Sequence, residues 1–68
     1  MAFSKKDIIT NSKNLYSCMR KMNHYSLEEL QNMINLKNTD LCLALIQLIQ
    51  DKKVERGKDK NGVYYFSI

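Results

Sequence analysis

The chain has 68 residues, of which 44% are hydrophobic and 26% are charged, with two glycines and no proline. A domain of this size buries only about 60% of its surface on folding, which argues against a deep catalytic pocket and hence against an enzyme. The formal net charge of +4 at pH 7 suits a polyanionic partner. The composition predicts a single, mostly helical α+β domain over residues 1–68.

The charge is distributed unevenly along the chain. Residues 1–25 carry a net charge of +4, residues 26–51 of −3 and residues 52–68 of +3. The two ends of the chain are therefore basic, and the middle is acidic.

A first helix is predicted from about Lys5 to Met22. Ser4 followed by Asp7 resembles a capping box, and apolar residues recur at roughly helical spacing after it. These apolar residues are Ile8, Leu15, Met19 and Met22. The stretch 10–12 has poor helix propensity, so residues 1–11 alternatively form a loose arm, with the helix restarting at Ser12.

A second, short helix is predicted from Leu27 to about Asn35. Ser26 and Glu29 make a capping box, and Leu27, Leu30 and Ile34 fall on one face. Tyr25, just before it, is a residue type enriched in strands, so a short extra strand is expected there. We expect His24 to be an ordinary linker residue.

The third helix has the strongest periodic signal in the chain. Asn38 or Thr39 is the expected N-cap, and the helix should run to about Asp51. The predicted core stripe is Leu41, Ala44, Leu45, Leu48 and Ile49. Leu43 and Ile46 fall outside this stripe, so the outer face of the helix is unusually apolar.

From Val54 onward the apolar period changes to two, which predicts a β-hairpin. The turn dipeptide Asn61-Gly62 lies in its charged tip. Strand alternation puts Tyr64, Phe66 and Ile68 on one face, which we expect to pack onto the first and third helices.

The order of helix, β-like link, short helix, turn, apolar helix and basic hairpin is that of a winged helix-turn-helix domain. Five segments carry the likeness: Ser26-Leu27-Glu28-Glu29-Leu30, the turn at Lys37-Asn38, Ala44-Leu45-Ile46-Gln47-Leu48-Ile49, Lys53-Val54-Glu55-Arg56 and Gly62-Val63-Tyr64-Tyr65-Phe66. In these segments residues 12–68 resemble small bacterial winged-helix regulators and the core of MarR-like proteins. The resemblance implies a DNA-binding transcriptional or accessory regulator.

In such families the third helix enters the major groove and the hairpin, or wing, contacts phosphates or the minor groove. Carried over by position, the DNA-binding residues are Lys37, Asn38, Thr39, Leu43, Gln47, Arg56, Lys58, Lys60 and Asn61. Asn38 and Gln47 are suited to adenine edges, Thr39 to a phosphate and Leu43 to a thymine methyl group. A single copy contacts few base pairs, so a homodimer or a partner already on the DNA is expected.

A second hypothesis treats the same fold as a protein-interaction module that does not bind DNA. The third helix has no arginine, and Asp40 in its first turn would repel phosphate. An apolar stripe flanked by polar residues is typical of a protein contact. In that case Cys42, Leu43 and Ile46 form the interface.

Other functional classes find little support in the residues. Cys18 and Cys42 have no metal-ligand spacing and are expected to be buried thiols, and His24 is the only histidine. We therefore expect no metal and no cofactor. The longest apolar run, 41–46, is far too short to span a bilayer, and no leader pattern opens the chain. A cytoplasmic, reducing setting is expected.

Overall fold

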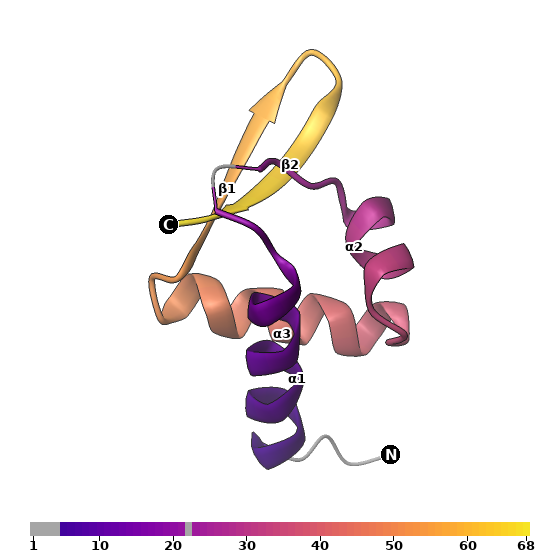
Figure 1. Cartoon of the computed structure of the whole chain (residues 1–68), viewed down its shortest axis with the longest axis vertical. Coiled ribbons are helices and arrows are strands. Elements are labelled where there is room, and N and C mark those ends of the chain that lie inside the picture. The colour runs from indigo at the N-terminus through magenta and orange to yellow at the C-terminus, as the bar shows by residue number, and fades with distance from the viewer. Residues whose placement is uncertain (1–4, 22) are drawn as a thin grey trace.

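Three helices followed by a two-stranded antiparallel hairpin make up the fold (Figure 1). The computed structural model describes residues 5–21 and 23–68. The elements are α1 (Lys5–Cys18), α2 (Leu27–Met33), α3 (Asn38–Gln50), β1 (Val54–Asp59) and β2 (Gly62–Ser67). α1 crosses α3, and the hairpin rises from the C-terminal end of α3 as a wing (Figure 1). This is the layout of a winged helix, as predicted.

α1 runs without a break through the stretch of poor helix propensity. The Ser12 hydroxyl is buried and donates a hydrogen bond of 2.7 Å to the Ile9 carbonyl, which satisfies it inside the helix. The alternative prediction, in which residues 1–11 form a loose arm and the helix restarts at Ser12, is therefore wrong. The helix also ends at Cys18, earlier than expected, while Met19 still packs in the core. The expected roles of Ser4 and Met22 lie outside the described residues.

Tyr25 ties the link between α1 and α2 to the hairpin. Its N–H donates to the Tyr65 carbonyl at 2.8 Å and its carbonyl accepts from the Tyr65 N–H at 2.7 Å, an isolated antiparallel bridge. The short extra strand expected at Tyr25 is thus reduced to a single bridge, and the sheet has two strands. The Tyr25 hydroxyl accepts a bond of 3.0 Å from the Arg20 N–H, which holds the chain just after α1. β2 consequently lies between Tyr25 and β1.

α2 begins with the predicted capping box. The Ser26 N–H donates to Glu29 Oε1 at 3.0 Å, and the Glu29 N–H donates to Ser26 Oγ at 3.1 Å. Leu30 is fully buried. The helix ends at Met33, because Ile34 takes an extended conformation, so the predicted end near Asn35 is two residues too late.

α3 supplies much of the core, and one residue of its predicted core stripe is exposed. Leu41, Ala44, Leu45 and Leu48 are buried as predicted, but Ile49 is 37% exposed. The core cluster lies on the side of α3 that faces α1 and α2, and Ile49 lies at its edge, beside the hairpin. The N-cap is Lys37 rather than Asn38 or Thr39, and no side chain caps this end.

The C-terminal end of α3 makes a Schellman motif. Lys52 has a φ of 60°, its N–H donates to the Ile49 carbonyl, and the Lys53 N–H donates to the Leu48 carbonyl, both at 3.0 Å. This left-handed residue turns the chain from the helix into β1.

The hairpin packs on the core through the face opposite to the one predicted. Tyr64 and Phe66 do share a face, but Tyr65 packs against the core cluster and Ser67 is buried. Ile68 is 55% exposed. The backbone bridge from Tyr25 to Tyr65 fixes this orientation. The thiols also differ from expectation: Cys18 is exposed and Cys42 is half-buried, and both are free.

Candidate nucleic-acid interface

The two faces of the hairpin carry opposite charges. β1 and β2 pair in register from Val54 opposite Ser67 to Asp59 opposite Gly62. Because successive side chains of a strand point to opposite faces, Arg56 and Lys58 share one face and Glu55 and Asp59 share the other. The hairpin therefore has a cationic face and an acidic face, although its sequence mixes the two signs.

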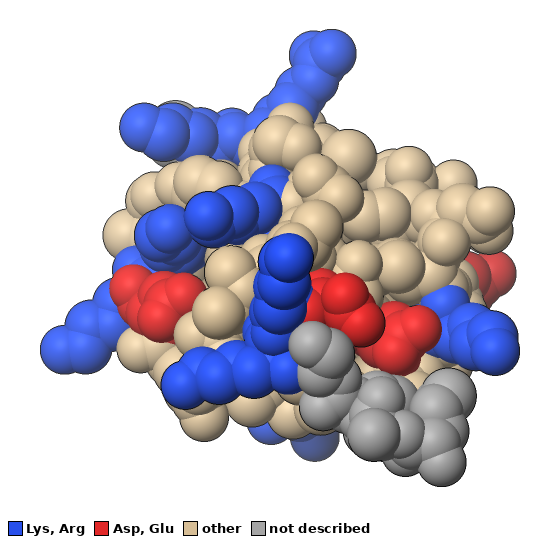
Figure 2. All heavy atoms as spheres, turned by 90° about the horizontal axis from the view of Figure 1, so that it is seen from below, with Lys and Arg blue, Asp and Glu red and all other residues tan. Residues whose placement is uncertain are grey.

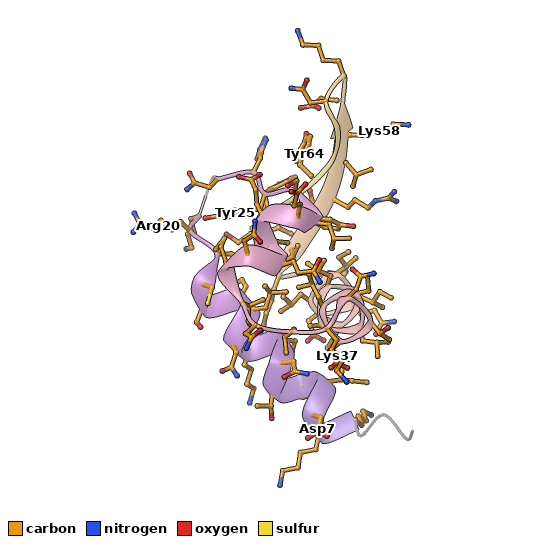
Figure 3. The ribbon with its side chains drawn as sticks, turned by 90° about the vertical axis from the view of Figure 1, so that its right-hand side faces the viewer. Asp7, Arg20, Tyr25, Lys37, Lys58 and Tyr64 are labelled. Carbon is orange, nitrogen blue, oxygen red and sulfur yellow. The ribbon has the colours of Figure 1, made fainter. Side chains whose placement is uncertain are left out.

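The cationic face of the hairpin adjoins the outer side of α3. Arg56 lines a groove of about 320 Å³ whose other walls are Cys42, Leu45, Ile46, Ile49 and Tyr65. Lys58 and Tyr64 project from opposite sides of the hairpin (Figure 3). The wing and α3 thus form one surface, with an apolar floor and cations at its wing edge.

The acidic face holds an aromatic cluster that fastens the wing to the rest of the protein. The His24 ring stacks on the Tyr64 ring, with centroids 4.2 Å apart and planes inclined by 9°. Phe66 lies beside both, at 5.2 Å from the His24 ring and 5.9 Å from the Tyr64 ring. His24 is therefore not the plain linker residue that was expected, since it anchors the hairpin.

The N-terminal end of α3 presents the first group of predicted DNA-binding residues. Lys37, Asn38 and Thr39 are all exposed there. Asp40, whose charge opposes phosphate, is half-buried. One turn further, Leu43 is half-buried and Ile46 is 51% exposed. The outer face of α3 is consequently polar at its start and apolar in its middle.

Gln47 lies away from the groove, on the same side of α3 as the predicted residue Leu43, which precedes it by four positions. It is five positions from Cys42, which is about 140° around the helix at 3.6 residues per turn. Its side-chain amide donates to both carboxylate oxygens of Asp51 at 3.2 Å. The geometry therefore does not bring Gln47 to the groove that Arg56 lines.

Lys60 and Asn61 form the tip of the wing. The two residues make the turn between β1 and β2, and the Asn61 N–H donates to Asp59 Oδ1 at 2.8 Å. Gly62, with a φ of 117°, completes the reversal that the dipeptide Asn61-Gly62 predicted. The two tip side chains are exposed, so the cationic edge of the wing extends outward from Arg56 through Lys58 to Lys60.

Two residues of this surface, Ile49 and Gln50, were not predicted from the sequence to bind, and a third, Lys52, was considered only as one of the basic residues of the hairpin. Ile49 lines the groove but was assigned to the core, and Gln50 is exposed one turn after Ile46. Lys52 lines a second groove, of about 610 Å³, at the base of the hairpin, where Ile49, Arg56 and also Glu55 contribute to the walls. Gln50 could have been predicted from the sequence, because it lies four positions after Ile46 and so on the same face of α3. The position of Lys52 could not, because it depends on the turn after α3.

The remaining positive charge is not gathered on one face. Seen from below, lysine and arginine side chains project from several sides, with carboxylates between them (Figure 2). Arg20 extends from the link after α1, on the other side of the molecule from Lys58 (Figure 3). The wing is therefore the place where cations and the outer side of α3 coincide.

Within residues 5–21 and 23–68, no three His, Cys, Asp or Glu side chains are grouped so that they could hold a metal ion. None of the helices described is long and apolar enough to cross a membrane. No protein-family model matches the chain, and no match was found among curated proteins or among solved structures. The function is therefore inferred from the fold and from the chemistry of this surface.

Proposed function

We propose that this protein binds duplex DNA through the cationic face of its wing and the outer side of α3, and acts as a small transcriptional or accessory regulator. One observation carries the proposal: the strand register places Arg56 and Lys58 on the face that adjoins α3 and turns Glu55 and Asp59 away from it. The fold is one in which a helix and a wing contact DNA together.

The chemistry of the surface suits a duplex. Exposed cations on the wing neutralise phosphates and release counterions, which supplies affinity without sequence information. Lys37 adds a cation at the N-terminal end of α3, next to the exposed side chains of Asn38 and Thr39. The interface of one such module is about 600–1,000 Å². Useful specificity therefore calls for a homodimer or for a second DNA-bound protein.

The test is a salt titration of binding to a random duplex. The wild-type protein should lose affinity steeply as salt rises, and the variant Lys58→Glu with Lys60→Glu should lower the logarithmic slope by about two, since each phosphate contact contributes about 0.9. The matched control is Lys5→Glu with Lys13→Glu, which changes the net charge equally at two exposed positions on α1. An equal effect of both pairs, or no binding at low salt, would contradict the proposal.

A second candidate function is the docking of another protein on the outer side of α3. It is favoured by the exposure of Ile46 (51%) and Ile49 (37%) beside the half-buried Cys42 and Leu43. Ile46→Asp should abolish docking of a protein, whereas Lys58→Glu should leave it intact. If the protein instead binds DNA through phosphate contacts, Lys58→Glu should weaken binding and Ile46→Asp should affect it less.

A further inference from the structure

α3 lacks the side chains that read guanine. Between Asn38 and Gln50 it contains no arginine and no lysine, the residues that make the commonest specific contact, to O6 and N7 of guanine. The single charged residue in this range is Asp40. The side chains of α3 that are available for base contacts in a major groove are therefore amides, a hydroxyl and apolar groups.

The apolar groups form a continuous strip on the side of α3 that adjoins the wing. Cys42, Ile46 and Ile49 follow one another at four and three positions, the spacing of one helix face, and all three line the groove beside Arg56. Ile46 projects furthest, with half of its surface exposed. In the major groove the apolar feature of the bases is the C5-methyl group of thymine.

The charges around the strip favour a polyanion as its occupant. Arg56 lines the groove itself, and Lys58 lies on the same face of β1 two residues further toward the tip. Lys37 is exposed at the other end of α3. Glu55 and Asp59 alternate to the opposite face of β1, so Arg56 and Lys58 border the strip on its wing side, and Lys37 is exposed beyond the N-terminal end of the strip.

The polar groups near the strip are consistent with the same base pairs. Asn38 is exposed at the start of α3 and Gln50 near its end, and carboxamides pair with N6 and N7 of adenine. The Gln47 amide is already held by Asp51, so it does not add a competing contact.

From these placements we infer that the strip of Cys42, Ile46 and Ile49 contacts thymine methyl groups, and that the protein prefers A·T-rich duplexes for this reason. The inference rests on the DNA binding proposed above, and it names the base chemistry that α3 recognises. Phosphate contacts by the wing position the helix, and the methyl contacts of Ile46 select the sequence.

The experiment compares an alternating d(AT) duplex with the same duplex in which every thymine is replaced by uracil. The two differ only in the C5-methyl groups. Burying one methyl group against Ile46 should favour the thymine duplex about fourfold, equivalent to about 0.8 kcal/mol. A second pair of probes, an alternating d(GC) duplex with and without 5-methylcytosine, should show a gain of similar size from methylation.

Two variants separate direct contact from changes in duplex shape. Ile46→Ser removes the apolar side chain from an exposed position, so the fold should persist. The ratio of the affinities for the thymine and uracil duplexes should fall toward one, and the dependence of binding on salt should be unchanged. Met33→Ser on α2 replaces an apolar residue of similar exposure (40%) that does not line the groove, and should leave the preference intact. A preference due to duplex stiffness alone would survive Ile46→Ser, and this result would overturn the inference.

Three further outcomes would also overturn it, and they are distinguishable from one another. Equal binding of the thymine and uracil duplexes removes the methyl contact but leaves the proposed DNA binding intact, whereas no binding of either duplex at low salt removes both. Sedimentation of the free protein completes the test. A dimer that Ile46→Ser dissociates would show that a second copy occupies the strip.

Discussion

Gly57 lies directly beneath the phenol ring of Tyr64, the residue opposite it in the hairpin. A Cβ atom at position 57 would stand 2.5 Å from the Tyr64 hydroxyl oxygen and 2.6 Å from Cε1, closer than real Cβ contacts allow. The same ring stacks on His24, so it is held between β1 and the link before α2. Tyr64 therefore connects the wing to the rest of the protein, and Gly57 makes room for it.

Gly57→Ala should destabilise the protein by about 1–3 kcal/mol, because the ring must move away from a position that His24 fixes. Urea unfolding measures the loss. In a Tyr64→Ser background the same substitution should cost much less, since the obstructing ring is gone, and the two changes should be strongly non-additive. Equal costs in the two backgrounds would show that the packing of Gly57 against Tyr64 is unimportant.

Ser26→Ala should cost about 1 kcal/mol of the free energy of unfolding. Seven residues are too few for α2 to be stable in isolation, so the helix depends on its cap and on the burial of Leu30. Ser17→Ala is the control, because the exposed Ser17 hydroxyl only donates to the Asn14 carbonyl within α1. Thermal unfolding of both variants should show a clear shift for Ser26→Ala and almost none for the control.

Local patterns predicted most of the elements because each has a local cause. The capping box at Ser26 depends on Glu29, three residues away, and the core stripe of α3 depends on helical spacing alone. The turn at the hairpin tip depends on Gly62, which takes a positive φ. These features were predicted correctly because the interactions involved span only a few residues.

The errors concern contacts between distant parts of the chain. Alternation grouped Tyr64 with Phe66, but which face meets the core is decided by the backbone bonds of Tyr65 to Tyr25, 40 positions away. Ile49 has the spacing of a core residue, yet it lies where α3 passes the hairpin and is partly exposed. Strand alternation alone separates the charges of the wing, but which of the two charged faces adjoins α3 depends on the same long-range contacts.

Lys52→Gly should stabilise the protein. A residue with a side chain pays about 1–2 kcal/mol to occupy the left-handed region, and glycine does not, although its greater freedom in the unfolded chain offsets part of the gain. We expect a net increase of about 0.5–1 kcal/mol, seen as a higher urea midpoint with an unchanged slope.

The control for Lys52→Gly is Lys53→Gly at the next position. Lys53 does not have a positive φ, and its ammonium group lies 5.8 Å from the centre of the Tyr16 ring. Glycine should therefore destabilise the protein there. A gain at both positions would mean that loss of a lysine charge, rather than backbone conformation, explains the effect at Lys52.

Neighbouring residues of β1 offer the sharpest test of the two-faced wing. Glu55 and Arg56 are adjacent in sequence and both exposed, but they point to opposite faces of the hairpin. Arg56→Glu should weaken DNA binding and reduce the salt slope by about one, because a phosphate contact on the α3 side is lost. Glu55→Arg should leave the slope unchanged, since the new cation lies on the face of Tyr64 and His24. Fluorescence anisotropy of a labelled duplex across a salt series measures both. If Glu55→Arg steepened the slope as much as Arg56→Glu reduced it, net charge rather than the face of the wing would govern binding.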